Sequence, residues 1–313
     1  MKIAFMFPGQ GAQYIGMGKD LYIHYKSVRD IFDETDEILQ ENFVDTVFNG
    51  NDDEIKRTEN TQPAILMVST AIAQLLIDMG FNPIIAAGLS LGEYSALVTA
   101  KSFTYRDAIP LVRKRGIIMS SSVPAGKGAM SAVIGLEEER LLACCEEAEK
   151  YGMVSIANYN CPGQMVISGE TEAVNIASQL AKKAGAKRVV PLSVSGPFHS
   201  LLLKPASYAL AEELKNVNIN PPVIPVISNV TAKPVTTSEE IRSLLIKQVY
   251  SPVRWEDSVR YMISIGVNVF LELGPGKALT GFIRRIDNSI RAYNVEDLNT
   301  LERISENILS GKE

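Results

Sequence analysis

The pentapeptide Gly88-Leu89-Ser90-Leu91-Gly92 constrains the possible folds of this chain more than any other segment. It matches the pattern G-x-S-x-G, and it lies between residues 84–89, an apolar run typical of a buried strand, and residues 94–100, a helical segment. The glycines permit a sharp turn from strand to helix, which lifts the serine hydroxyl out of the sheet. The pattern therefore predicts an α/β protein with Ser90 as candidate nucleophile. The alternative is a glycine-rich turn with an incidental serine.

The remaining periodicity supports this fold class, because predicted strands alternate with predicted helices. Strands are predicted at residues 2–7, 84–89, 223–228 and 267–273, and helices at 14–42, 61–79, 94–100, 107–119 and 199–217. Alternation of this kind predicts a parallel sheet covered by helices on both faces.

Residues 126–195 have a different order of predicted strands and helices. Strands are predicted at 129–134, 153–157, 165–168 and 188–194, and helices at 137–151 and 170–184. This order, βαββαβ, is that of a ferredoxin-like unit. We therefore expect residues 1–125 and 196–313 to form one large domain, with residues 126–195 inserted as a small subdomain.

The composition excludes several classes of function. The chain has 313 residues, enough for one large domain or two, and its net charge is -5, with 31 Lys and Arg against 36 Asp and Glu. It has no Lys/Arg tract, which argues against binding to nucleic acid. The three cysteines, Cys144, Cys145 and Cys161, have no CxxC spacing and few histidines to complete a metal shell. We therefore expect neither a disulfide framework nor a bound metal, and we expect a cytoplasmic protein.

No membrane anchor is expected. The apolar run before Pro8 has only five residues, which is too short for a signal peptide. The most apolar longer stretch, residues 63–79, carries Ser69, Thr70, Gln74 and Asp78, which a bilayer-spanning helix rarely tolerates.

A nucleophilic serine needs a base, and histidine is the usual one. The chain has two histidines. His24 lies on a predicted amphipathic helix, where a surface or packing role is expected, whereas His199 follows a predicted strand, opens a predicted helix and lies at the predicted domain boundary. His199 is therefore the candidate base. The spacing leaves the group that orients it open, because 36 carboxylates and any backbone carbonyl are candidates. Three glycine-rich segments, at 9–11, 16–19 and 274–277, could suggest nucleotide binding. None of them completes the dinucleotide-binding pattern G-x-G-x-x-G or the phosphate-binding pattern G-x-x-x-x-G-K-[ST].

Eight motifs together resemble a known family. FPGQGAQYIGMG, GLSLGEYSAL, VRKRGIIM, NYNCPGQMVISG, GPFHS, SNVTA, QVYSPVRW and ELGPGKALTG occur in the order found in malonyl-CoA:acyl carrier protein transacylases, over nearly the whole chain. The chain also resembles the acyltransferase domains of modular fatty-acid and polyketide synthases. The resemblance implies a hydrolase-like α/β core with an inserted ferredoxin-like subdomain. It also implies transfer of malonyl from malonyl-CoA to acyl carrier protein in fatty-acid synthesis.

The resemblance also assigns catalytic roles. It implies that Ser90 accepts the acyl group and that His199 is its base. It implies that the backbone N–H groups of Gln10 and Leu91 form the oxyanion hole, and that the backbone carbonyl of Gln248 orients His199.

Substrate contacts are implied in the same way. Arg115 would pair with the free carboxylate of malonyl; without the resemblance, a solvated charge beside Arg113 and Lys114 would be favoured. Asn160 is a candidate near the substrate, with a turn residue as the alternative. Phe198 precedes His199 and is associated in the family with malonyl rather than branched acyl units. Leu89 departs from the family pattern, in which this position is usually histidine. We expect the difference to concern local packing or a contact behind the nucleophile, and not the base.

Three alternatives remain open. They are a discrete acyltransferase of a polyketide synthase, a serine hydrolase of the esterase type and a catalytically silent binding protein. We expect no cofactor, malonyl-CoA and acyl carrier protein as partners, and a monomer.

Overall fold

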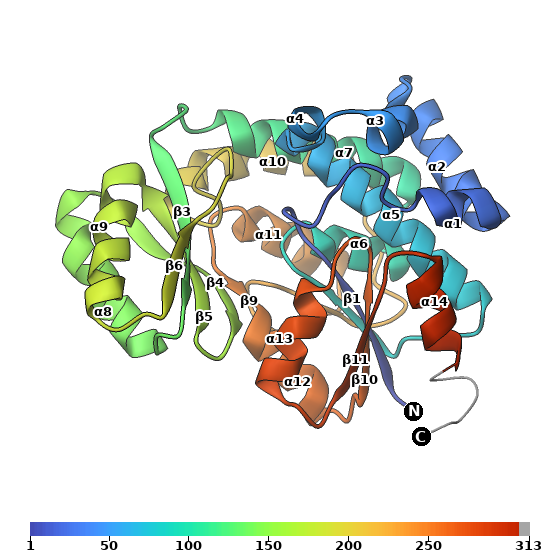
Figure 1. Cartoon of the computed structure of the whole chain (residues 1–313). Coiled ribbons are helices and arrows are strands. Elements are labelled where there is room, and N and C mark those ends of the chain that lie inside the picture. Colours follow the sequence, from blue (N-terminus) through green and yellow to red (C-terminus); the bar gives the residue numbers. More distant parts are fainter. Residues whose placement is uncertain (307–313) are drawn as a thin grey trace.

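The computed structural model describes residues 1–306. Its larger sheet has six strands in the order β11-β10-β1-β2-β7-β8. Figure 1 labels β1, β10 and β11 of this sheet. The strands are β1 (Ile3–Phe7), β2 (Ile85–Gly88), β7 (Val226–Ile227), β8 (Pro234–Val235), β10 (Val269–Leu273) and β11 (Arg291–Val295). All neighbours are parallel except β7 and β8. This confirms the predicted α/β class with a parallel core.

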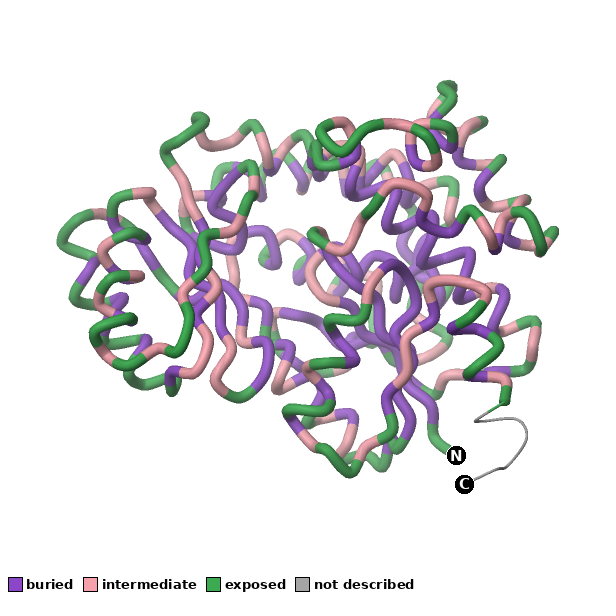
Figure 2. The backbone as a smooth tube through the Cα atoms, viewed as in Figure 1, coloured by how far each residue is buried: buried purple, intermediate pink, exposed green. Residues whose placement is uncertain are grey.

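Helices cover both faces of the larger sheet. On β1, Phe5 and Phe7 belong to one apolar cluster, while Ala4 and Met6 belong to another on the opposite face. This alternation is the period of two that a strand imposes. The first cluster packs against α5 (Thr58–Asp78), α6 (Gly92–Thr99), α7 (Tyr105–Ser121) and α10 (Lys204–Lys215), and the second against α12 (Trp255–Ser264) and α13 (Ala278–Ile286). Figure 2 shows the central strands running through the buried interior.

The register of β1 and β2 brings the carboxyl ends of these two strands together at the elbow. Phe7 pairs with Gly88, so the two parallel strands end side by side. The loop after β1 and the turn after β2 therefore meet at one place. This is the position at which open α/β sheets bind ligands.

Helix α5 is long and apolar enough to span a membrane by length and composition. However, 89% of its most apolar window is buried inside the protein. It packs between α2 (Lys26–Leu39), α6 and α7. Its apolar surface is therefore covered by the protein itself, as in a core helix.

The smaller sheet has five strands in the order β6-β3-β5-β4-β9. Four of them, β3 (Gly128–Ile134), β4 (Val154–Cys161), β5 (Gln164–Glu170) and β6 (Arg188–Pro191), pair with one another in antiparallel fashion. Helices α8 (Glu138–Ala148) and α9 (Thr171–Lys183) pack against this sheet at the left of Figure 1. Element order and strand arrangement are those of a ferredoxin-like unit.

The smaller sheet is not formed by residues 126–195 alone. Its fifth strand, β9 (Val253–Arg254), belongs to the later part of the chain and pairs in parallel with β4. The predicted boundaries at 126 and 195 stay a prediction.

Two predicted helices differ in the structure. Residues 14–42 form α1 (Lys19–His24) and α2, because Tyr25 between them has extended backbone angles. Residues 199–217 form a short 3-10 helix, η2 (Leu201–Leu203), followed by α10. His199 does not open a helix, since its φ of 59° lies in the left-handed region. The expectation for its local structure was therefore wrong.

Further elements were not predicted. These are the strands β8, β9 and β11 and the helices α3 (Phe43–Asn49), α4 (Asp52–Ile55), α11 (Ser238–Gln248), α12, α13 and α14 (Leu298–Ile304). The 3-10 turn η1 (Glu149–Tyr151) ends the predicted helix at 137–151. Strands of two residues, such as β8 and β9, are too short to show a period in the sequence.

Candidate active site

Ser90 lies in the turn between β2 and α6, and its φ of 54° is in the left-handed region. Both flanking glycines are needed for the close approach of backbone segments. A Cβ on Gly88 would lie 1.9 Å from the carbonyl carbon of Gly92, and a Cβ on Gly92 would lie 2.1 Å from the carbonyl oxygen of Phe7. A serine held at positive φ costs on the order of 1–3 kcal/mol, and strain of this kind clusters at functional sites. The predicted elbow is present.

His199 lies next to Ser90. Its Nε2 is 2.8 Å from Ser90 Oγ, and its Nδ1 is 2.8 Å from the carbonyl oxygen of Gln248. A carbonyl only accepts, so Nδ1 carries the proton and Nε2 is free to accept the serine proton. The structure thus brings together the predicted nucleophile, the predicted base and the backbone carbonyl implied to orient it. His24, by contrast, is exposed, and its Nδ1 contacts the carbonyl oxygen of Asp20.

The environment of His199 favours its neutral form. Only 4% of the residue is exposed. Burial first, and then the nearby Arg115 cation, lower its pKa from 6.5 to about 4. At neutral pH the imidazole is therefore unprotonated and can act as a base.

Arg115 lies beside both residues and is 1% exposed, so the interpretation as a solvated charge is wrong. Its Nη2 donates to Ser90 Oγ at 3.2 Å and to Gln248 Oε1 at 3.0 Å, and its Nη1 donates to Gln62 Oε1 at 2.9 Å. The guanidinium also lies 5.2 Å from the ring centre of Tyr94. Burial lowers the pKa of this guanidinium, but arginine keeps its charge in proteins. A buried cation thus points at the candidate nucleophile.

A cavity of about 440 Å³ opens in front of Ser90. Both parts of the protein line it: Gln10, Leu91 and Arg115 come from loops and helices around the larger sheet, and Met130 and Asn158 come from strands of the smaller sheet. Among residues 1–306, the backbone N–H groups of Gln10 and Leu91 donate to no protein acceptor. Both are therefore available to a ligand at Ser90.

Three further predicted residues line this cavity. Asn160 is 6% exposed, and its Oδ1 has no hydrogen-bond partner among the described residues. Phe198 is 7% exposed and lies beside His199. Leu89 lines the cavity and packs against the apolar cluster that includes Trp255. All eight predicted site residues except Gln248 line the cavity, and Gln248 lies behind it.

Sequence reasoning missed two buried residues behind the elbow. Asn229 Oδ1 accepts from the N–H of Ser90 at 2.6 Å, and its Nδ2 donates to the carbonyl oxygen of Gly88 at 2.7 Å. Glu93 Oε2 accepts from the N–H of Asn229 and from Gln248 Nε2. The signal was available, because Glu93 directly follows the elbow and Asn229 stands in the SNVTA motif.

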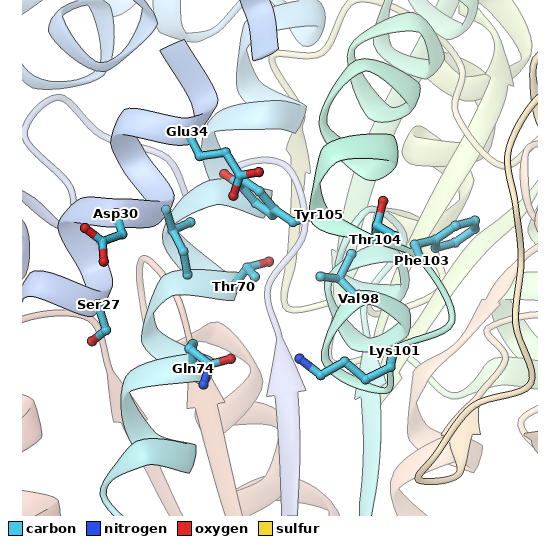
Figure 3. Close-up of a pocket in the computed structure, with 11 residues that line it drawn as sticks. Ser27, Asp30, Glu34, Thr70, Gln74, Val98, Lys101, Phe103, Thr104 and Tyr105 are labelled. Atoms are coloured by element: carbon cyan, nitrogen blue, oxygen red, sulfur yellow. The ribbon is translucent and has the colours of Figure 1, made fainter. Parts of the chain in front are cut away.

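A second cavity, of about 380 Å³, lies between α2, α5 and the start of α7 (Figure 3). Asp30, Glu34, Gln74 and Lys101 line it, together with Tyr105. It shares no lining residue with the cavity at Ser90, and it contains no imidazole that could activate a nucleophile. Within residues 1–306, no cluster of three or more His, Cys, Asp and Glu is arranged to hold a metal.

The fold and the site define a class: a hydrolase-like α/β protein built for acyl chemistry on a serine. The family model described as acyl transferase domain matches residues 4–304, and the chain belongs to this family.

Named relatives agree with this membership. The malonyl CoA-acyl carrier protein transacylase of Bacillus subtilis (strain 168) is 47% identical over 302 residues, which cover 96% of this chain and 95% of that protein. The enzyme of the same name from Escherichia coli (strain K12) is 44% identical over 292 residues, covering 93% of this chain and 94% of that one.

Solved structures extend the likeness to three dimensions. An acyl carrier protein S-malonyltransferase from Vibrio cholerae superposes with a TM-score of 0.95 at 44% identity, covering 97% of this chain and 100% of that one. A malonyl-transacylase in complex with a type II PKS acyl-carrier protein superposes with a TM-score of 0.96 at 42% identity, covering 98% and 100%. The chain thus has the α/β hydrolase-like fold with a small subdomain.

Proposed function

We propose that this chain transfers malonyl from malonyl-CoA to the phosphopantetheine thiol of acyl carrier protein, through a malonyl ester of Ser90. The observation that carries the proposal is the buried Arg115 guanidinium, 3.2 Å from the hydroxyl that lies 2.8 Å from His199. It places a fixed cation where an acyl group with a free carboxylate would lie. The names of the relatives support the same reaction.

The first half-reaction forms the ester. Ser90 Oγ attacks the thioester carbon while His199 Nε2 takes the hydroxyl proton. The N–H groups of Gln10 and Leu91 stabilise the oxyanion of the tetrahedral intermediate. The intermediate collapses by breaking the C–S bond, and His199 returns the proton to the departing CoA thiolate.

The second half-reaction repeats these steps with a different thiol. His199 takes the proton of the phosphopantetheine thiol, and the thiolate attacks the malonyl ester of Ser90. The C–O bond then breaks, and the proton returns to Ser90 Oγ. The chain thus needs two substrates in turn and no cofactor. The carbonyl of Gln248 holds the imidazole in the required tautomer throughout.

Recognition of malonyl rests on charge. The carboxylate must lose water to enter the cavity, and the Arg115 guanidinium compensates by pairing with it, which a guanidinium can do through two parallel hydrogen bonds. Asn160 Oδ1, buried without a partner among the described residues, is a further polar group for the substrate. Phe198 lines the cavity beside His199, and we assign it a role in favouring the unbranched malonyl unit.

We assign the reaction to fatty-acid synthesis in the cytoplasm by a monomer. The three cysteines are free, which suits a reducing compartment. Because one relative is bound to a type II PKS carrier protein, supply of a polyketide synthase is the second candidate.

The test is to follow malonyl from labelled malonyl-CoA with and without holo acyl carrier protein. We expect rapid appearance of label on the carrier and slow release of malonate without it. Rapid release of malonate at the same rate in both cases would instead make the chain a hydrolase. A wild-type chain that never acylates would make it a binding protein.

A further inference from the structure

Glu93 is a buried carboxylate that the proposed reaction does not use. It lies on α6 three residues after Ser90, is 2% exposed and does not line the cavity. Its Oε2 accepts two hydrogen bonds, from the N–H of Asn229 at 3.0 Å and from Gln248 Nε2 at 2.7 Å. A buried carboxylate is costly unless its environment compensates it. The two hydrogen-bond partners of Glu93 therefore indicate the role of this carboxylate.

Both partners of Glu93 hold the backbone of Ser90. Asn229 Oδ1 accepts from the N–H of Ser90 at 2.6 Å, and Gln248 Nε2 donates to the carbonyl oxygen of Ser90 at 3.1 Å. The amide of Asn229 also donates to the carbonyl oxygen of Gly88 at 2.7 Å. A serine at φ 54° keeps this conformation only if its surroundings fix it. These hydrogen bonds supply that constraint.

Gln248 links Glu93 to the base and to the guanidinium. Its carbonyl oxygen accepts from His199 Nδ1 at 2.8 Å, and its Oε1 accepts from Arg115 Nη2 at 3.0 Å. A glutamine amide can adopt two orientations. Here only one fits, because a carboxylate cannot donate and a guanidinium cannot accept. Glu93 and Arg115 thus fix the amide from its two ends.

The intervening amide also keeps Arg115 open for substrate. A carboxylate bonded directly to the guanidinium would occupy the donors that a substrate carboxylate needs. Glu93 instead lies one amide away. The hydrogen bonds of Arg115 go to the neutral groups Gln62, Gln248 and Ser90. Its charge is therefore partly offset without blocking the face toward the cavity.

We propose that Glu93, together with Asn229, is a positioning residue for acyl transfer: by accepting hydrogen bonds it fixes Gln248 and Asn229, and through them Ser90, His199 and Arg115. The inference rests on the proposed function. Burial raises the pKa of Glu93 to about 7, against the lowering effect of its two hydrogen-bond donors and of Arg115. Even when the carboxyl is protonated, one oxygen can still accept both bonds.

The test is single-turnover acylation of Ser90 by malonyl-CoA without acceptor, followed by rapid quenching and intact-mass measurement. The amplitude counts molecules that can be acylated, and the rate constant reports how well each is arranged. A merely structural role lowers the amplitude, whereas a positioning role lowers the rate constant. We expect Glu93→Ala and Asn229→Ala to lower the rate constant on the order of 10²-fold, the effect of a misplacement of about 1 Å.

Glu93→Gln keeps an oxygen that can accept both hydrogen bonds, so its loss should be much smaller. Two controls remove a hydrogen-bond acceptor from residues that do not line the cavity. Asp36 accepts from the N–H of Val44, and Asn51 caps α4 by accepting from the N–H of Glu54. Asp36→Ala and Asn51→Ala should leave the rate constant unchanged and affect stability alone.

Two results would overturn the inference: a wild-type rate constant in folded Glu93→Ala, or an equal loss in Glu93→Gln and Glu93→Ala. If the alanine variants yield no protein that can be acylated, Glu93→Asp decides, because its shorter side chain cannot reach both donors. A wild-type rate constant in that variant would also refute it. If Ser90 of the wild type is not acylated by malonyl-CoA, the proposed function is refuted but the positioning role of Glu93 is not. The same variants are then compared by the rate at which phenylmethanesulfonyl fluoride labels Ser90, where equal rates would refute the positioning role.

Discussion

Replacing Arg115 with alanine should change which acyl group the enzyme prefers. Arg115 is 1% exposed, and its hydrogen bonds go to neutral groups. The malonyl carboxylate would thus form a desolvated ion pair rather than a surface pair worth about 0–1 kcal/mol. Loss of one partner of such a pair costs about 2–5 kcal/mol. At 1.36 kcal/mol per tenfold, kcat/KM for malonyl-CoA should fall roughly 30- to 5,000-fold.

Acetyl-CoA should lose much less. It has no carboxylate, so the variant loses chiefly the hydrogen bond from Arg115 to Ser90 Oγ, worth about 0.5–1.5 kcal/mol, or roughly 2- to 13-fold. The assay is kcat/KM for both thioesters in wild type and Arg115→Ala. Arg113→Ala is the matched control, because Arg113 lies on the same helix and pairs with Glu41 at the surface. Equal falls for both substrates in Arg115→Ala would refute the role in recognition.

Three further predictions concern the base, the pH profile and the carrier protein. His199→Ala should slow acylation roughly 10²- to 10⁴-fold, and an unchanged rate constant would place the base elsewhere. Because a pKa of about 4 keeps His199 neutral, the rate constant should be flat from pH 8 to pH 5.5; an ordinary histidine, protonated below its pKa near 6.5, would lose roughly tenfold over that range. An acidic carrier protein needs a cationic surface on this chain of net charge -5. Charge reversal of exposed Lys182, Lys183, Lys187, Arg188, Arg284 and Arg285 should slow transfer to the carrier at low salt but not acylation by malonyl-CoA, and an unaltered transfer rate would place docking elsewhere.

The elbow was predictable because its chemistry is local. A strand that ends in G-x-S-x-G leaves the chain few alternatives, and the structure requires glycine at both positions. The predicted strand at 84–89 and helix at 94–100 correspond to β2 and α6 within two residues. The ferredoxin-like order could also be predicted from local sequence, because each of its elements is long enough to show a hydrophobic period.

The burial of Arg115 could have been predicted from the helical spacing of α7, although its charge suggests an exposed residue. On α7 the buried residues include Ala108, Leu111, Val112 and Met119. Arg115 follows Leu111 by four residues and precedes Met119 by four, so it lies on the buried stripe of the helix. Its position next to Arg113 and Lys114 suggests that Arg115 is exposed to solvent. Its spacing from the apolar residues of the helix instead predicts that it is buried.

Other features depend on contacts between distant segments. The carbonyl of Gln248 orients His199, and a carbonyl is present at every residue, so no spacing could identify it. Asn229 lies 139 positions from Ser90, whose N–H it binds. Strand β9 has two residues and pairs with β4 from nearly a hundred residues away. Such contacts are fixed by tertiary packing and leave no local pattern.

The central claim is a covalent malonyl ester on Ser90, and intact-mass measurement after mixing with malonyl-CoA tests it most directly. Without acceptor, the wild-type chain should gain one malonyl group, which peptide mapping locates at Ser90 and which holo acyl carrier protein removes. Ser90→Ala should gain none. Equal labelling of Ser90→Ala, or a wild-type chain that stays unlabelled while malonyl reaches the carrier, would contradict the account.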